Sequence, residues 1–349
     1  MLDAPGSSTR SVAALRWDGE RLHLLDQTLL PAEERWLSLT GARDTAEAIA
    51  RLAVRGAPNI GVAAAYGLAM AVSADPSPAA VREAAGILSS SRPTAVNLAY
   101  AVDRVHAAAS DATGELGERA APAAARAEAE RVHSEEVLAA GEIARLGAEL
   151  LRGRRRILTH CNTGALATPG AGSALGVITA LADANPNVTV LACETRPLLQ
   201  GARLTAWELQ RLGIGFELLV DGAAAGLIRT GQVDAVIVGC DRVAANGDVA
   251  NKVGTYAHAL AAAAARIPFI VAGPMSTVDL ATPDGAAIPV EQRGGDEVVA
   301  FGGATVAPDG IAVRNPAFDV TPAALIDAII TERGVARAPY AESLAALAA

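Results

Sequence analysis

Residues 235–242 read AVIVGCDR, a run of apolar residues that ends in a cysteine, an aspartate and an arginine. The same pattern occurs at 156–162 (RILTHCN) and at 188–196 (VTVLACETR). None of these apolar runs alternates with polar residues, and helical patterns separate them. Such runs are typical of parallel strands that are buried on both faces of a sheet. The sequence therefore predicts an α/β protein with a Rossmann-like parallel sheet in its C-terminal part.

The chain before residue 154 has a different pattern. Apolar residues alternate on either side of Asp18-Gly19, which predicts a β-hairpin, and helical spacing then extends over most of the chain as far as 153. We therefore predict a mainly helical N-terminal domain with a small β element over 1–130, a connecting helix over 131–153, and the Rossmann-like domain over 154–349. A chain of 349 residues is long enough for two such domains.

Composition excludes several classes of protein. Hydrophobic residues make up 51% of the chain and charged residues 19%, which excludes extensive disorder, and a net charge of −9 does not suit a nucleic-acid partner. Charged or glycine residues interrupt the apolar runs, so we expect no membrane span. The three cysteines match no zinc or disulfide spacing, and the five histidines are scattered, so no metal cluster is expected. The N-terminus lacks the pattern of a secretory signal, and we expect a cytoplasmic protein with reduced thiols.

Two further apolar runs, 216–220 and 269–272, complete a set of five predicted strands, and polar side chains stand directly after them. Ligands of open parallel sheets bind beyond the carboxyl ends of the strands. Cys161 precedes a turn of small residues that leads to a helix, where the ionisation of a thiol can be tuned. Asp241 follows the most apolar run, and partial desolvation there suits a general acid. The simpler alternatives are a buried inert cysteine for the first, and an ion pair with Arg242 or a helix cap for the second. Cys193 and Cys240 are expected to be small packing residues.

Lys252 is the single lysine among 29 basic residues. Arginine replaces lysine on a solvated surface but not where a compact ammonium group is needed, so Lys252 is a candidate functional residue. With Asn251 it lies near a predicted helix start, which indicates an anion site. Two helix junctions are weaker candidates of the same kind, Arg55-Gly56-Ala57-Pro58 and Ser91-Arg92-Pro93-Thr94. Neither glycine-rich nucleotide-binding motif, GxGxxG after the first strand or GxxxxGK[ST], occurs.

Six ordered segments resemble the methylthioribose-1-phosphate isomerase family, part of the initiation-factor-2B-like superfamily. They begin at Arg55, Arg92, Leu158, Glu194, Asp241 and Arg314 and read RGAPNIGVAAAYGLA, RPTAVNLAYAVDR, LTHCNTGALAT, ETRPLLQGARLTAWEL, DRVAANGDVANKVGTYAHA and RNPAFDVTP. The resemblance implies an enzyme of methionine salvage that converts 5-methylthioribose 1-phosphate into 5-methylthioribulose 1-phosphate. It also implies a homodimer that needs no metal or redox cofactor.

The same resemblance implies roles for individual residues. Cys161 and Asp241 would be the catalytic pair. The substrate contacts, mainly to phosphate and sugar hydroxyls, would be Arg55, Gly56, Ala57, Arg92, Gln200, Asn251 and Lys252. Gln200 has its role from the resemblance alone, whereas the other residues are also candidates from their own sequence positions.

Two alternatives stay open. The first is an isomerase of another 5-substituted 5-deoxyribose 1-phosphate or of ribose 1,5-bisphosphate. A second phosphate would need a second basic cluster, for which Arg196, Arg203 and Arg242 are the only candidates, so an uncharged substituent is favoured. The second alternative is a non-catalytic assembly subunit of the same fold. The presence of Cys161, Asp241 and Lys252 together favours an enzyme with a small-molecule substrate and no nucleic-acid or membrane partner.

Overall fold

The computed structural model describes residues 12–92 and 96–349, and the chain forms two compact units. The N-terminal unit contains Met1–Gly141 and the segment Thr163–Gly172, and the C-terminal unit contains Glu142–Asn162 and Ser173–Ala349. Two sequence predictions concern residues outside the described ranges. One is the expectation about a secretory signal in residues 1–11, and the other is the anion candidate Ser91-Arg92-Pro93-Thr94, of which Pro93 and Thr94 are not described. The predicted α/β class, with a helical N-terminal part and a C-terminal parallel sheet, is confirmed.

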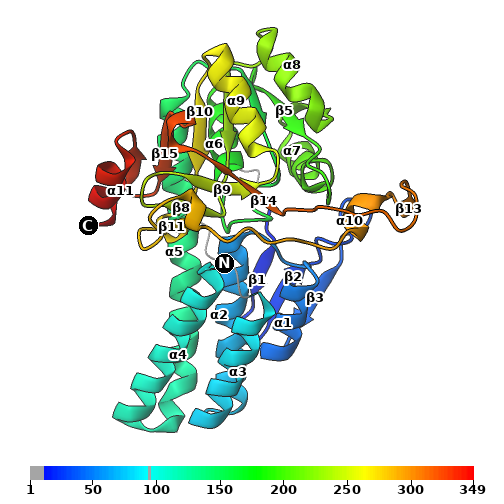
Figure 1. The fold of residues 1–349 in the computed structure, drawn as a ribbon. Helices are drawn as coiled ribbons and strands as arrows, with labels where there is room; N and C mark the ends of the chain where they lie inside the picture. The colour runs from blue at the N-terminus through cyan, green and yellow to red at the C-terminus, as the bar shows by residue number, and fades with distance from the viewer. Residues whose placement is uncertain (1–11, 93–95) are drawn as a thin grey trace. The chain divides into compact units, whose positions relative to one another are not determined.

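The N-terminal unit is built around a buried helix, α2, which packs against α1, α3 and α4 (Figure 1). The helices are α1 Ala42–Ala50, α2 Ala57–Ala74, α3 Pro78–Ser91, α4 Val96–Leu116 and α5 Ala121–Leu150, the last of which continues into the C-terminal unit. By length and composition α2 could cross a membrane, but 78% of that window is buried by the rest of the protein, as in a core helix.

A three-stranded antiparallel sheet completes this unit, with strands β1 Leu15–Trp17, β2 Leu22–Leu25 and β3 Trp36–Leu39. The predicted hairpin is confirmed, because β1 and β2 pair on either side of Asp18-Gly19. Gly19 has φ +102°, and the Asp18 carboxylate accepts hydrogen bonds from the backbone N–H groups of Glu20 and Arg21. The local turn chemistry thus accounts for the hairpin, whereas β3 was not predicted.

The C-terminal unit contains a seven-stranded sheet in the order β16-β15-β10-β7-β4-β5-β6, parallel except for β16. The strands are β4 Arg156–Thr159, β5 Thr189–Cys193, β6 Gly215–Leu219, β7 Ala235–Val238, β10 Phe269–Ala272, β15 Ala328–Thr331 and β16 Gly334–Ala336. The helices are α6 Ala174–Ala184, α7 Ala206–Leu212, α8 Ala224–Arg229, α9 Thr255–Ala265, α10 Asp296–Val299 and α11 Tyr340–Ala348.

Both faces of the central strands of this sheet are buried, as their non-alternating sequences predict, whereas the edge strand β6 is largely exposed. In β4 the side chain of Ile157 enters one core together with α5, α6 and α7, and the next side chain, Leu158, enters a second core with α8, α9 and α11. Because successive residues of a strand point to opposite faces, every position of such a strand must be apolar. This requirement explains why the strands read as continuous apolar runs.

A second sheet of four short strands, in the order β11-β8-β9-β14, was not predicted from the sequence. Its strands are β8 Arg242–Ala244, β9 Val249–Lys252, β11 Val278–Asp279 and β14 Phe318–Thr321, and a separate hairpin joins β12 Ala300–Phe301 to β13 Ala304–Thr305. Asn251 and Lys252 therefore lie on a strand, near the start of α9 at Thr255 but not at it. Pairing with the sequence-distant β14 places them there.

The order of the strands contains a topological switch point. The chain runs from β4 to β5 and β6 in one direction and then returns to β7 on the other side of β4. In open α/β sheets the ligand crevice lies beyond the carboxyl ends of the two strands at such a reversal. This rule leads us to expect the ligand site beyond the carboxyl ends of β4 and β7.

Candidate active site

Cys161 follows β4 and is 6% exposed. Its backbone is left-handed, with φ +64°. The backbone N–H of Cys161 donates to Oγ1 of Thr195 (2.8 Å), and the hydroxyl of Thr205 donates to the Cys161 carbonyl (2.6 Å). Thr195 follows β5, and Thr205 ends a π-helical turn, Gly201–Thr205. Two residues of the segment between β5 and α7 therefore fix both peptide groups of the cysteine.

Asn162 extends this arrangement. Its Nδ2 donates to Oε1 of Glu208 (2.6 Å) and to Oγ1 of Thr205 (3.2 Å). Glu208 lies on α7 and is 1% exposed, so this buried carboxylate is held by hydrogen bonds and not by bulk water. Because buried polar groups in such networks are costly to displace, the turn after β4 is held rigidly.

Asp241 follows β7, and its backbone N–H donates to the carbonyl of Ala250 on β9 (2.9 Å). Its side chain is half-buried. Strands β4 and β7 are direct neighbours, with Leu158 paired to Val236, so Cys161 and Asp241 follow the two strands at the switch point. Arg242, the simpler ion-pair partner considered for Asp241, lies 3.5 Å from the carboxylate of Asp279.

Lys252 is held at the end of β9. Its Nζ donates to the carbonyl of Ala317 (2.8 Å) and lies 4.7 Å from the ring centroid of Phe318. Asn251, its neighbour, is 4% exposed and donates from Nδ2 to Oγ1 of Thr255 (2.9 Å). A cation over an aromatic face is stabilised by the ring quadrupole, which keeps the ammonium group in place.

The nearby helix start does not supply the expected anion site. Asp319 accepts hydrogen bonds from the N–H groups of Gly254 (2.7 Å) and Tyr256 (3.2 Å) at the N-terminus of α9. Burial raises the pKa of the Asp319 carboxyl. A protein carboxylate therefore already occupies the N–H groups at the start of α9, where the sequence predicted an anion.

Gln200 is 7% exposed and precedes the π-helical turn. Its Oε1 is buried and has no hydrogen-bond partner within the described residues. Buried oxygens are nearly always paired in folded proteins, so an unpaired one suits a donor from a ligand, such as a sugar hydroxyl. Gly201 brings this turn against β5, because a Cβ at this position would lie 1.7 Å from the Cys193 carbonyl oxygen.

The remaining predicted substrate contacts belong to the N-terminal unit. Gly56, with φ +83°, is the N-cap of α2, and Ala57 is the first residue of that helix, whose N-terminus has no side-chain cap. A Cβ on Gly56 would lie 2.3 Å from the carbonyl oxygen of Ala167, so only glycine fits. Arg55 and Arg92 are half-buried, and Arg92 is the C-cap of α3. The N–H of Asn59 in the first turn of α2 donates to the Ala167 carbonyl (3.2 Å), so backbone already occupies part of this helix start, and the anion site there stays a prediction.

Contrary to expectation, two histidines and a cysteine lie together in the C-terminal unit. His160 Nε2 lies 2.8 Å from the Val253 carbonyl oxygen, and His258 Nε2 lies 3.2 Å from His160 Nδ1. Cys193 Sγ is 3.6 Å from the same nitrogen of His258. The sequence did not reveal this group because His160 and Cys193 share one face of the sheet only through strand pairing, and α9 brings His258 onto that face.

Such a group could hold a metal ion, but hydrogen bonding accounts for it. His160 donates from Nε2 to Val253, which leaves Nδ1 to accept a hydrogen bond from His258. Burial lowers the pKa of His160 to about 4 and that of His258 to about 3, and it raises the pKa of the Cys193 thiol. The three groups are therefore neutral near pH 7, which agrees with the packing role expected for Cys193.

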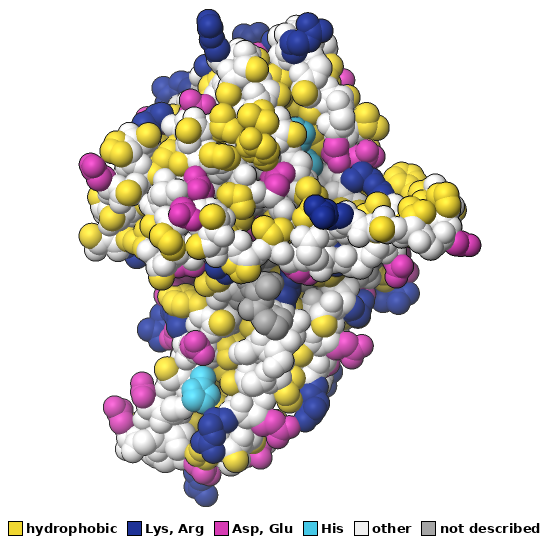
Figure 2. All heavy atoms as spheres, viewed as in Figure 1, with side chains coloured by type: hydrophobic (Ala, Val, Ile, Leu, Met, Phe, Trp, Pro, Cys, Tyr) yellow, Lys and Arg dark blue, Asp and Glu magenta, His cyan; other side chains and the backbone are white. Residues whose placement is uncertain are grey.

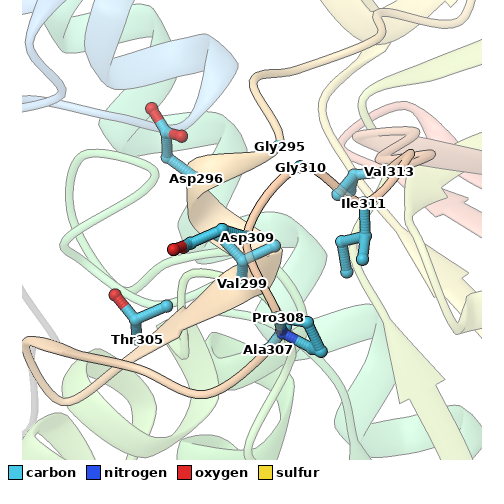
Figure 3. Close-up of a pocket in the computed structure, with 10 residues that line it drawn as sticks. All are labelled: Gly295, Asp296, Val299, Thr305, Ala307, Pro308, Asp309, Gly310, Ile311 and Val313. Carbon is cyan, nitrogen blue, oxygen red and sulfur yellow. The ribbon is translucent and has the colours of Figure 1, made fainter.

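A hollow of about 440 Å³ lies elsewhere, around α10 and the loop that follows β13 (Figure 3). Its two charged lining side chains, Asp296 and Asp309, are both carboxylates, so it repels an anionic sugar phosphate. Apolar side chains gather on the surface of the segment that contains α10, β12 and β13 and the loop after them (Figure 2), where Phe301, Val306 and Ile311 are exposed. The hollow contains none of the predicted site residues.

The initiation factor 2 subunit family model matches residues 53–338 of the chain. This chain belongs to that family. Among family members, it is 57% identical over 328 residues to a methylthioribose-1-phosphate isomerase of Anaeromyxobacter sp. (strain K), with 94% of each chain covered. It is 49% identical over 343 residues to the protein of that name from Syntrophotalea carbinolica, with 97% of this chain and 99% of the relative covered.

Two solved structures of the family have the same fold. The 5-methylthioribose 1-phosphate isomerase from Pyrococcus horikoshii OT3 has a TM-score of 0.90 at 38% identity and covers 97% of this chain and 96% of its own. The structure named translation initiation factor eIF-2B, subunit delta, from A. fulgidus has a TM-score of 0.86, also at 38% identity, and covers 97% and 99%. The family thus includes structures whose names denote an enzyme and a translation factor.

Sequence reasoning missed the residues that hold Cys161. Thr195 and Asp221 follow predicted strands, which was the only signal they gave, and Thr205 gave none. Asp221 lies after β6, and its carboxylate accepts hydrogen bonds from the N–H groups of Thr195 (2.8 Å) and Arg196 (2.7 Å). These contacts join residues 26 and 25 positions apart, so only the parallel pairing of β5 with β6 brings them together.

Proposed function

We propose that this chain is an aldose–ketose isomerase of methionine salvage that converts 5-methylthioribose 1-phosphate into 5-methylthioribulose 1-phosphate. The observation that carries the proposal is the position of Cys161 and Asp241 after the two neighbouring strands at the topological switch point. The names of relatives that are 57% and 49% identical over nearly the whole chain support the same reaction.

The chemistry needs an acid and a second group that acts at carbon. A phosphate on C1 locks the substrate as a furanose, so the ring must open before hydrogen can move from C2 to C1. Protonated Asp241 donates its proton to the ring oxygen, and the Cys161 thiol or thiolate serves the C2-to-C1 step. The hydrogen leaves C2 and arrives at C1, and the C2 hydroxyl gives its proton to the Asp241 carboxylate as the C2 carbonyl forms. The reaction therefore balances, with Asp241 regenerated and no external oxidant or reductant.

The substrate contacts in this proposal are those that the family resemblance implies. Lys252 and Asn251 lie on β9, whose neighbour β8 begins immediately after Asp241. Lys252 would hold the phosphate, and Gln200 would accept a hydrogen bond from a sugar hydroxyl. Arg55, Gly56, Ala57 and Arg92 remain contacts that the resemblance implies. Because the phosphate stays attached throughout, it serves as an anchor and not as a reacting group.

The arginines considered for a second phosphate have protein partners. Arg242 pairs with Asp279, and Arg203 Nε donates to the Leu198 carbonyl (3.1 Å). Arg196 donates from Nη2 to the Val298 carbonyl (3.0 Å) and lies 5.4 Å from the ring centroid of Phe301. Because these three guanidinium groups already have protein partners, an uncharged C5 substituent such as methylthio is favoured over a second phosphate.

The alternative, an assembly subunit, has support in the name of the structure from A. fulgidus. Against it stand the combination of Cys161, Asp241 and Lys252 and the identity to relatives named as isomerases, which is higher than the 38% identity to that structure. A purification that yields a stable heteromeric complex without isomerase turnover would reverse this ranking.

The direct test compares turnover of 5-methylthioribose 1-phosphate, other 5-substituted 5-deoxyribose 1-phosphates and ribose 1,5-bisphosphate. We expect kcat/KM to be highest for the methylthio compound. We expect Asp241→Asn and Cys161→Ala each to lower kcat by about 10²–10⁴-fold with little change in binding, as for loss of an acid–base group. Asp234→Asn is the control, because Asp234 immediately precedes β7, at the opposite end from Asp241, and pairs with Arg156. A Cys161 or Asp241 variant with normal turnover would remove that residue from the mechanism.

A further inference from the structure

Two residues after neighbouring strands have an unusual backbone. Of the described residues, five that are not glycine have a positive φ, and Cys161 (φ +64°) and Thr195 (φ +67°) are two of them. A left-handed backbone is unfavourable for any residue with a side chain and is a clear outlier for a β-branched one such as threonine. The two are joined by the hydrogen bond from the Cys161 N–H to the Thr195 hydroxyl oxygen.

The surroundings hold Thr195 in this conformation. Its N–H donates to Oδ1 of Asp221, and the next N–H, from Arg196, donates to Oδ2 of the same carboxylate. The Thr195 side chain is fully buried, and its hydroxyl lies 3.1 Å from the Cys193 carbonyl oxygen. The hydroxyl hydrogen is therefore directed at Cys193, which leaves a lone pair of Oγ1 to accept the Cys161 N–H.

A continuous chain of contacts thus runs across three strand ends, from Asp221 after β6 through Thr195 after β5 to Cys161 after β4. On the other side of Cys161, Thr205 donates to its carbonyl oxygen. With both flanking peptide groups fixed, the direction of the Cα–Cβ bond of Cys161 is fixed as well. Local strain that the surrounding structure holds in this way is a feature of functional sites.

We propose that Thr195 is a positioning residue that sets the direction of the Cys161 thiol for the hydrogen-transfer step. The inference rests on the proposed function, because it takes Cys161 to be the group that acts at carbon. The hydroxyl of Thr195 is the part that matters, since a methyl group in its place could neither accept the Cys161 N–H nor donate to Cys193. A displacement of about 1 Å at a reacting group costs about 10²-fold in rate.

The experiment compares Thr195→Val, which keeps the shape and loses the hydroxyl, with Thr195→Ser, which keeps the hydroxyl. Thr331→Val is the matched control, because the Thr331 hydroxyl is also fully buried, accepts the Arg333 N–H and lies near the Gly334 carbonyl oxygen, but at the end of β15. We expect Thr195→Val to lower kcat by about 10²-fold with KM little changed. We expect the Thr195→Ser and Thr331→Val variants both to have a kcat close to that of the wild-type protein.

A second readout does not depend on turnover. The rate of Cys161 alkylation by iodoacetamide, followed by peptide mass spectrometry, should rise in Thr195→Val relative to wild type and Thr331→Val, because the released turn exposes the buried thiol. Unchanged kcat and unchanged alkylation in Thr195→Val would overturn the inference, and so would a Thr195→Ser variant as slow as Thr195→Val. If wild type turns over none of the sugar phosphates, the proposed function fails, and alkylation alone then decides whether Thr195 positions Cys161.

Discussion

At the scale of single residues, Lys252 combines an informative sequence position with a defined structural one. It is the single lysine of the chain, and its ammonium group is held against the Ala317 carbonyl and the Phe318 ring. A compact ammonium group fits beside this carbonyl and this ring, whereas the planar guanidinium group of arginine is larger and needs a different set of acceptors.

We expect Lys252→Ala to raise KM for the sugar phosphate much more than it lowers kcat, because it removes binding that is the same in the ground and transition states. Lys252→Arg should recover only part of the affinity, although it keeps the charge. Steady-state kinetics of the two variants check this. A lowered kcat at unchanged KM would instead assign Lys252 to the chemical step.

The buried histidines make stability depend on pH. The pKa of His160 is lowered to about 4 and that of His258 to about 3, from 6.5, so the folded protein excludes protons that the unfolded chain binds. Their neighbours are Cys193, Asp221 at 3.9 Å from His160, and Lys252, whose charge lowers the His160 pKa further.

The contribution of these histidines to stability is therefore complete above pH 6.5 and is lost as the pH falls from 6.5 towards 4. In that window the free energy of unfolding should fall by about 1.4 kcal/mol per pH unit for each histidine. Urea denaturation at several pH values measures the slope. His258→Leu removes one of the two histidines and should reduce the dependence of the unfolding free energy on pH. An unchanged pH dependence would show that His258 does not titrate between pH 6.5 and 4.

At the scale of elements, the π-helical turn Gly201–Thr205 joins β5 to α7 and supplies the Thr205 hydroxyl to the Cys161 carbonyl. π-Helical turns are rare and occur frequently at functional sites. The close approach of this turn to β5 needs Gly201, because a side chain there would collide with the Cys193 carbonyl.

Gly201→Ala should therefore destabilise the protein by about 1–3 kcal/mol, as overpacking does, and lower kcat as the turn moves. Gly226→Ala is the matched control, since Gly226 lies within α8 and a Cβ there would meet nothing within 4 Å. That control should gain about 0.5–1 kcal/mol from better helix propensity. Thermal and urea unfolding, with kinetics, compare the two, and equal stabilities would contradict the packing argument.

The sequence predicts some elements better than others. The strands buried on both faces, such as β4 and β7, are evident because each position must be apolar. The four-stranded sheet is not evident, because β8, β9, β11 and β14 are two to four residues long and polar residues such as Asn251 lie within them. Short strands of this kind depend on partners that are distant in sequence, which no local pattern reveals.

At the scale of the whole molecule, the strand order decides where the chemistry lies. The sequence places polar side chains after five predicted strands, and the observed order selects β4 and β7, because the chain reverses direction between them. The same order brings Thr195 and Asp221 to Cys161. Neither contact is visible in the sequence, since each joins residues more than 25 positions apart.

We propose that the protein is a cytoplasmic homodimer, as the family resemblance and the composition suggest. Sedimentation or light scattering of the purified protein should then give a particle of two 35.3 kDa chains. A monomer over the working concentration range, or a heteromer with other proteins, would contradict this proposal. The dimer is expected to keep its mass at high salt if its interface is mainly apolar, because salt screens ion pairs but does not weaken apolar contacts.

The sequence by itself determined the α/β class, the hairpin and the candidate residues Cys161, Asp241 and Lys252, because burial on both faces, turn chemistry and unusual residue usage are local signals. Only the tertiary structure decided that Lys252 lies on a strand, that Asp319 caps α9 in place of an anion, and that Thr195 and Asp221 hold Cys161. The physical reason is that strand order and the hydrogen bonds across strand ends arise from pairing between distant segments, for which a single sequence carries no periodic signal.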